Sequence, residues 1–229
     1  MTINEYFGDW AKAVDLNEVD RLMKKLISMK KDMHLTLCPL PKDTFKCFHL
    51  CPFNDLRVVI LGHDPYPNLI DNKPVATGVA FANSSDTLEE NYSPSLKVLW
   101  DSVIDFTKPH ENINFDPSLE KWEEQGVLML NSSLSCIAGK TGSHYLMWRP
   151  FIIHLLKQLS HLKTGIVYLL LGKVAQSYKE YIKDDFNYVL SYPHPSFYAR
   201  KLMTMPHVFD KINNILISQN GYGIKWYNY

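Results

Sequence analysis

Val58-Val59-Ile60-Leu61-Gly62-His63-Asp64-Pro65-Tyr66 is the stretch of sequence that decides the fold. Its four leading apolar residues predict a buried parallel strand. The chain breaks at Gly62, so Asp64 falls in the first turn beyond the strand, and Pro65 stiffens the backbone after it. In open α/β sheets, ligands bind in the crevice outside the carboxyl ends of the strands. Asp64 is therefore a candidate catalytic carboxylate, although this stretch alone fits a turn-capping aspartate equally well.

Three more apolar segments have the length of strands, at residues 127–130, 166–171 and 188–190. Helical patterns accompany them: one around residues 19–27 with Asn17 as its cap, one opened by Ser93-Pro94, one opened by Pro150, and one over about residues 206–218. Residues 38–52 are expected to form a loop. Short strands separated by helices predict a three-layer α/β/α fold with a central, mainly parallel four-stranded sheet. No linker or repeat is evident, so residues 1–229 are expected to form a single domain.

Composition excludes several classes of protein. Lys and Arg number 24 and Asp and Glu number 24, so the formal net charge is zero. Proteins that coat long nucleic acids are usually basic, so only a local positive patch is expected. The sequence has no run of 18 apolar residues and no signal-peptide pattern, which predicts an intracellular protein, cytoplasmic or nuclear, that is neither secreted nor inserted in a membrane. Cys47 and Cys51 flank His49, but no second close Cys/His pair completes a metal site, so no metal is expected.

Each predicted strand delivers a polar residue to its carboxyl end. These residues are Asp64, Asn131, Lys173 and, four residues past the last strand, His194. In a parallel sheet they all arrive at one edge. A loop histidine is most often structural, yet His194 lies between two prolines at the same edge as an aspartate. Asp64 and His194 together suggest proton transfer or charge stabilisation, and the amide of Asn131 suits the edge of a base.

Several segments resemble, in order, those of the family 1 uracil-DNA glycosylases, over roughly residues 60–227. Residues 62–66 resemble the water-activating motif of that family, and residues 76–81 resemble the stretch that bears its stacking phenylalanine. Further segments similar to the family are the proline-rich loop at 93–97, the uracil-reading strand at 126–131, the segment 142–148, the histidine-bearing loop at 194–196, and the closing helix and tail at 207–226. The resemblance implies an enzyme that flips uracil out of DNA and hydrolyses its N-glycosidic bond, with no metal or cofactor.

The resemblance also implies roles for individual residues. Asp64 would hold a water molecule and stabilise the cationic sugar, and His194 would stabilise negative charge on uracil O2. In the uracil pocket, Phe81 would stack on the base, Tyr66 would exclude the methyl group of thymine, and Asn131 would bind N3 and O4 and so reject cytosine. His63 occupies the pocket position where the family usually has glutamine.

The implied DNA contacts depart from the family in part. Ser95 and Ser196 would bind phosphates. Where the family has Pro-Leu-Ser after the histidine motif, this chain has Phe197, Tyr198 and Ala199, so its wedge leucine and one serine are missing. Tyr198, preceded by Phe197, is the expected replacement that stacks in the gap left by the flipped base, and Arg200 is the expected phosphate contact. Packing of Phe197 and Tyr198 against the protein is the alternative.

The implied partners are uracil-containing single- and double-stranded DNA, with DNA-mimicking protein inhibitors as further candidates, and the chain is expected to be a monomer. Pro67 stands where the family has histidine, a feature that resembles the poxvirus branch of the family. The loop at 68–75 is longer than is usual in the family. Pro67 and the altered residues 197–199 leave open a DNA-binding replication accessory protein of the processivity type on the same fold. A broader mismatch glycosylase is a third reading, against which Tyr66 argues.

Overall fold

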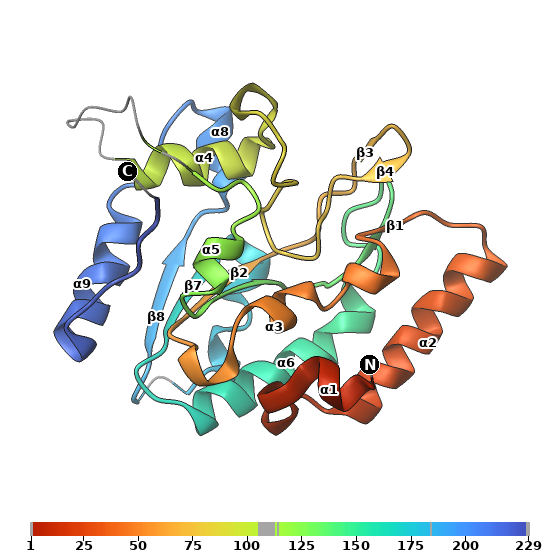
Figure 1. Ribbon diagram of the computed structural model, residues 1–229, viewed down its shortest axis with the longest axis horizontal. Helices are drawn as coiled ribbons and strands as arrows, with labels where there is room; N and C mark the ends of the chain where they lie inside the picture. The colour runs from red at the N-terminus through yellow and green to blue at the C-terminus, as the bar shows by residue number, and fades with distance from the viewer. Residues whose placement is uncertain (1, 105–112, 114, 184, 228–229) are drawn as a thin grey trace.

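The computed structural model describes residues 2–104, 113, 115–183 and 185–227. Its centre is a parallel four-stranded sheet in the order β5-β2-β7-β8, which confirms the predicted fold class (Figure 1). The strands are β2 (Val58–Gly62), β5 (Val127–Asn131), β7 (Val167–Leu171) and β8 (Tyr188–Tyr192). The register of β2 and β5 places Gly62 opposite Asn131, so both residues reach the same edge of the sheet.

Alternate residues of each strand face opposite layers, because side chains in a strand have a period of two. Val59 and Leu61 belong to the cluster that also holds apolar side chains of α2 (Leu16–Asp32) and α6 (Tyr145–Leu162). Val58 and Ile60 belong to a second cluster, with α4 (Pro94–Val103) and α9 (Val208–Asn220). Figure 1 shows these two pairs of helices on either side of the sheet. The continuous apolar runs of β2, β5 and β7 follow from burial on both faces, whereas β8, at the edge of the sheet, is partly exposed.

Shorter elements connect the main ones. The short helices are α1 (Ile3–Phe7), α3 (Lys46–Leu50), α5 (Glu120–Glu123), α7 (Lys173–Gln176) and α8 (Pro195–Arg200). Among the described residues, 3₁₀ turns lie at Gly8–Lys12, Pro41–Asp43, Phe53–Asp55, Glu89–Asn91 and Lys179–Tyr181. Two antiparallel ribbons pair β1 (Leu37–Cys38) with β6 (Cys136–Ile137) and β3 (Leu69–Ile70) with β4 (Lys73–Pro74).

Three local predictions are wrong. Residues 38–52 are not a plain loop, since they contain the end of β1, a 3₁₀ turn and α3. The cap of α2 is Asp15, whose carboxylate accepts hydrogen bonds from the backbone N–H groups of Asn17 and Glu18. Pro150 lies inside α6 instead of opening it. This proline removes only the hydrogen bond to the carbonyl of Leu146, whose residue is 81% exposed, so solvent can replace the bond.

In the part of the chain that the structure describes, no helix is long and apolar enough to cross a membrane. The four cysteines are free thiols, and all of them are buried. Burial raises the pKa of the Cys47 and Cys51 thiols well above the ordinary value. At neutral pH these two side chains therefore pack as small neutral groups.

Glu123 is a carboxyl group buried in the core at the end of α5. Its Oε1 accepts a hydrogen bond from the backbone N–H of Met129 at 3.1 Å, while Oε2 is buried without a partner among the described residues. Burial raises the pKa of Glu123 well above its ordinary value, and the hydrogen bond from Met129 opposes this only in part. The folded state therefore favours the neutral acid.

Glu123→Gln is expected to make stability less dependent on pH. Above a pKa of about 4.3 the unfolded chain loses the proton of this group, whereas the folded protein keeps it. This group therefore lowers the free energy of unfolding by about 1.4 kcal/mol for each pH unit between the unfolded and folded pKa values. Urea denaturation at about pH 5 and pH 8 measures the effect. Glu124→Gln, on the exposed side of the next turn, is the control, and equal pH dependence in Glu123→Gln and wild type would contradict the prediction.

Candidate active site

The carboxyl ends of β2 and β5 are fastened together. The backbone N–H of Ser132 donates to the carbonyl of Gly62 at 3.2 Å, and that of Ser133 donates to the carbonyl of His63 at 3.0 Å. Ser132 Oγ also donates to the carbonyl of His63, at 2.9 Å. These hydrogen bonds extend the strand pairing by two residues, so the turn that carries Asp64 has a fixed course.

Gly62 makes room for two side chains of the site. A Cβ atom at this position would lie 2.7 Å from Asn131 Oδ1 and 2.7 Å from Phe81 Cζ, which is closer than real Cβ atoms approach other atoms. The glycine is required here by close approach and not by its backbone angles. The amide of Asn131 and the ring of Phe81 can therefore meet above the end of β2.

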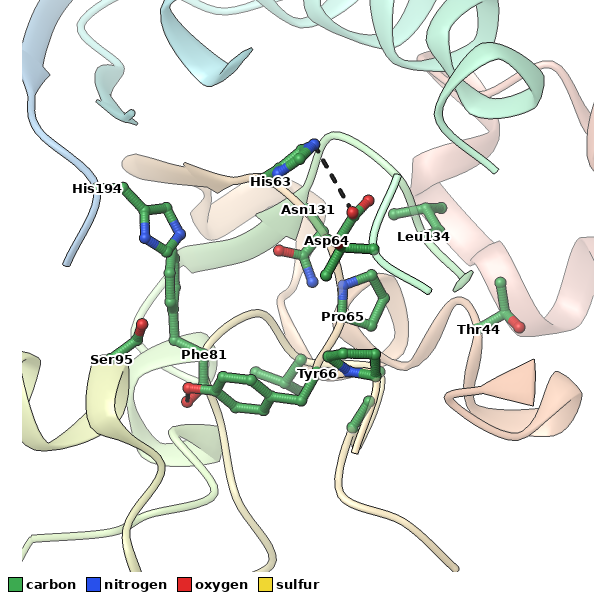
Figure 2. Close-up of a pocket in the computed structure, with 15 residues that line it drawn as sticks. Thr44, His63, Asp64, Pro65, Tyr66, Phe81, Ser95, Asn131, Leu134 and His194 are labelled. Carbon is green, nitrogen blue, oxygen red and sulfur yellow. Dashed lines mark hydrogen bonds and ion pairs between the residues drawn. The ribbon is translucent and has the colours of Figure 1, made fainter. Parts of the chain in front are cut away.

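A pocket of about 190 Å³ opens at this edge of the sheet (Figure 2). It brings together seven of the residues singled out from the sequence, namely His63, Asp64, Tyr66, Phe81, Ser95, Asn131 and His194. They come from the turn after β2, the segment before α4, the first turn of α4, the end of β5 and the start of α8. In Figure 2 the amide of Asn131 lies between Asp64 and the pair formed by Phe81 and His194.

Asp64 is held in place through one oxygen and keeps the other available. The side chain is 3% exposed, and its Oδ2 accepts a hydrogen bond from the backbone N–H of Gly142. His63 Nε2 lies 3.7 Å from the same oxygen. Asp64 Oδ1 is buried and has no partner among the described residues. Buried polar atoms are nearly always hydrogen-bonded, so this oxygen is a ready acceptor for a donor that enters the pocket.

His194 is neutral and has a defined tautomer. Its Nδ1 accepts a hydrogen bond from the backbone N–H of Ser196 at 3.2 Å, which makes it the N-cap of α8. Burial, with smaller effects from the nearby His63 and Arg200, lowers the pKa of His194 to about 4. Since Nδ1 is an acceptor, the neutral ring carries its proton on Nε2. The site therefore offers an uncharged N–H donor at neutral pH.

Phe81 has an unusual backbone. Its φ is +65°, in the left-handed region that non-glycine residues rarely adopt, and its ring is 6% exposed. The ring lies 5.7 Å from that of His194 at an interplanar angle of 47°. Tyr66 Oη donates a hydrogen bond to the carbonyl of Phe81 at 2.9 Å and so holds this conformation. Burial raises the pKa of Tyr66, so its hydroxyl stays protonated and remains a donor.

The residues predicted to contact DNA differ in their exposure and in the groups that they contact. Ser95 lines the pocket, and Ser196 Oγ lies 3.4 Å from Nη1 of the exposed Arg200. Phe197 is half-buried and its ring lies edge-on to that of Tyr198 at 5.3 Å. Tyr198 is 6% exposed and belongs to the second core cluster. The structure thus places the Tyr198 ring in the packed position that was the alternative to a wedge.

Several residues that shape the site were not given a role from the sequence. The backbone N–H of Gly142 fixes Asp64, and Leu134, Thr141 and Thr44 line the pocket. The sequence signal for Gly142 was the segment 142–148, which resembled the family pattern but suggested no contact with Asp64. Close by, Ser135 Oγ joins the buried His144 Nδ1 at 2.9 Å and accepts a hydrogen bond from Trp148 Nε1 at 2.9 Å. This network anchors the start of α6 next to the loop that holds Asp64.

Comparison with known proteins gives one consistent family. A model of the uracil DNA glycosylase superfamily matches residues 48–217. Uracil-DNA glycosylase 1 of Listeria innocua is 32% identical over 194 residues, 82% of each chain. The uracil-DNA glycosylase of Mycoplasmopsis pulmonis is 35% identical and covers 82% of this chain and 81% of its own. The crystal structure of mimivirus uracil-DNA glycosylase superposes with a TM-score of 0.74 at 21% identity, covering 99% of both chains, which shows a shared fold.

Gly62→Ala is expected to disturb the pocket while leaving the fold intact. The added methyl group meets the ends of two side chains, Asn131 and Phe81, which can move aside at a cost of roughly 1–3 kcal/mol. A crystal structure of the variant should show both side chains displaced, and its thermal unfolding should stay cooperative. Unmoved Asn131 and Phe81 side chains would contradict the close-approach argument.

His194 is expected to stay neutral at pH 6 with its proton on Nε2. The reason is the lowered pKa, about 4, and the hydrogen bond that Nδ1 accepts from Ser196. Two-dimensional ¹H–¹⁵N NMR of the imidazole nitrogens measures both properties, and His194→Gln identifies the signals. A ring protonated on both nitrogens at pH 6, or a proton on Nδ1 alone, would show that the cap geometry does not control this histidine.

Proposed function

The chain belongs to the uracil DNA glycosylase superfamily, and we propose that the pocket at the carboxyl ends of β2 and β5 is where it cuts uracil from DNA. The protein is a uracil-DNA glycosylase, a DNA-repair hydrolase of N-glycosidic bonds. Our assignment of residues rests on one observation: Asp64 and His194 line the same pocket, where one offers a hydrogen-bond acceptor and the other a hydrogen-bond donor. Asp64 has a carboxylate oxygen with no partner among the described residues, and His194 has a neutral N–H donor.

These two states match the charges that the reaction creates. When the bond between C1′ of deoxyribose and N1 of uracil breaks, the sugar becomes positive and the base becomes negative. The carboxylate of Asp64 stabilises the sugar, and its Oδ1 accepts a hydrogen bond from the water that attacks C1′. His194 Nε2–H donates to uracil O2 and stabilises the negative charge there. Water supplies the hydroxyl group at C1′ and a proton, so the products are free uracil and an abasic site.

The remaining pocket residues select the base. Phe81 stacks on the flipped uracil, and such a contact contributes about 1–3 kcal/mol. Asn131 binds N3–H and O4, a pattern that cytosine reverses, and Tyr66 occupies the space that the methyl group of thymine requires. His63, beside Asp64, replaces the usual glutamine at the pocket entrance. Because Tyr66 occupies this space, a mismatch glycosylase that accepts thymine is a weaker hypothesis than a glycosylase specific for uracil.

Ser95, Ser196 and Arg200 provide the phosphate contacts around the pocket. The serines lie in the first turns of α4 and α8, and Arg200 reaches toward Ser196. We infer that single- and double-stranded DNA are both substrates and that the chain acts as a monomeric single domain. A variant of mimivirus UNG has been crystallised in complex with UGI, with a TM-score of 0.79 and 23% identity over 98% of this chain and 87% of its own. On the basis of this shared fold, we infer that a DNA-mimicking protein inhibitor binds this chain as well. Nothing in the described site favours a non-enzymatic replication accessory role.

The assignment of Asp64 and His194 is tested by uracil release from a defined oligonucleotide. The wild type should release uracil in the presence of a chelator, because the proposed chemistry needs no metal. Asp64→Asn and His194→Ala should each lower the rate by about 10²–10⁴, the range for positioned acid–base or electrostatic groups. Thr204→Ala, at an exposed position outside the pocket, should keep the wild-type rate. Unchanged rates in both site variants would overturn the assignment.

A further inference from the structure

Leu202 is the most exposed large hydrophobic side chain in the described part of the protein. It lies two residues beyond the end of α8 and is 96% exposed. Single apolar residues on a surface are ordinary, and exposure alone indicates nothing. The backbone of this leucine is what sets it apart.

Leu202 occupies a helix-ending position that favours glycine. Its backbone N–H donates to the carbonyl of Ala199 at 3.2 Å, and that of Met203 donates to the carbonyl of Tyr198 at 3.0 Å. This pair of hydrogen bonds is the Schellman motif, in which the residue after the cap is left-handed and is usually glycine. The φ of Leu202 is +52°. A side chain in this conformation costs roughly 1–2 kcal/mol, and at 96% exposure no packing offsets that cost.

The turn is fixed rigidly relative to the pocket. α8 begins directly after His194, which lines the pocket, and it packs along α4 at the carboxyl edge of the sheet (Figure 1). Beyond the turn, the backbone N–H of Met205 donates to Ser102 Oγ of α4 at 2.8 Å. The step of eight residues from His194 to Leu202, at 1.5 Å per helical residue, places the leucine about 12 Å along the axis of α8 from His194.

The neighbours of Leu202 suit a nucleic acid more than an apolar protein surface. Arg200 and Lys201 directly precede it and are both exposed, and the Lys201 ammonium lies 4.4 Å from the centre of the Phe197 ring. Cations of this kind bind phosphates. An apolar tip beside phosphate-binding cations is the arrangement of proteins that insert a wedge between bases. Tyr198, the other candidate, is a residue of α8 whose side chain is buried.

We propose that Leu202 is the positioning residue that enters the base stack of duplex DNA and fills the gap left by the flipped uracil. The proposal rests on the function proposed above and adds to it the part played by the turn after α8. It explains why a strained, fully exposed leucine stands where glycine would cost less. The proposal implies that the Leu202 side chain becomes buried when the protein binds DNA.

The test is uracil excision under single-turnover conditions from a U·A duplex and from the same strand without its complement. Leu202→Ala and Leu202→Gly should slow duplex excision about 10- to 100-fold and change single-strand excision less than twofold, since no stack is opened there. Leu202→Met, with an apolar side chain of similar size, should restore most of the duplex rate. Leu162→Ala, which removes a 47%-exposed leucine at the end of α6, should match wild type on both substrates.

Two further readouts separate this role from a structural one. Leu202→Gly relieves the left-handed strain, so its melting temperature should not fall although its duplex rate does. Fluorescence of 2-aminopurine placed beside a non-cleavable uracil analogue should rise on binding of wild type and rise less with Leu202→Ala. Equal losses on both substrates, or a duplex rate within twofold of wild type in Leu202→Ala, would overturn the wedge. Absence of uracil release by wild type from either substrate would instead overturn the proposed function, and with it the wedge.

Discussion

The parallel pairing of β2 with β5 is the constraint on which the site depends. It sets Gly62 beside Asn131 and so brings the base-reading amide to the turn that carries Asp64. The same pairing continues through Ser132 and Ser133, whose hydrogen bonds fix the course of that turn. Because side chains alternate along a strand, a shift of one residue in this register would exchange the two core faces as well as misplace the amide. Burial of these strands on both faces therefore maintains the geometry of the pocket. The interactions that stabilise the sheet also hold the site residues in position.

Within the pocket, the environment gives two titratable groups different tasks. Asp64 receives one backbone hydrogen bond and keeps an oxygen open, so the negative charge is held still and remains available. His194 is half-buried, and its Nδ1 is occupied as a helix cap, so the ring donates from Nε2 without carrying a charge. A charged imidazolium this close to Asp64 and His63 would weaken the field that stabilises a cationic sugar. A neutral donor supports the negative base without that loss, because preorganised dipoles need not reorganise as charge develops.

The sequence predicts well what depends on local pattern and poorly what depends on contacts between distant segments. Continuous apolar runs marked all four sheet strands, and the polar residues after them identified Asp64, Asn131 and His194 of the pocket. The family resemblance was needed to single out Tyr66, Phe81 and Ser95. The start of α6 could not be found this way, because a proline inside the helix is tolerated at an exposed turn and mimics a helix start. The hydrogen bond from Gly142 to Asp64 joins residues far apart in the chain, and no spacing encodes it. The left-handed backbone of Phe81 likewise depends on Tyr66, and the burial of Tyr198 depends on its packing in the core around α4.

Phe81 and Leu202 share a feature that links the pocket to the surface beside it. Both are non-glycine residues with positive φ, and hydrogen bonds hold both conformations. The Tyr66 hydroxyl donates to the carbonyl of Phe81, and backbone hydrogen bonds at the end of α8 hold Leu202. Strained residues persist only where their surroundings over-determine them, and they gather at sites that bind ligands. The Phe81 ring lines the pocket and the Leu202 side chain is exposed, so each can meet a ligand. One would contact the face of the flipped base, and the other the space which that base has left.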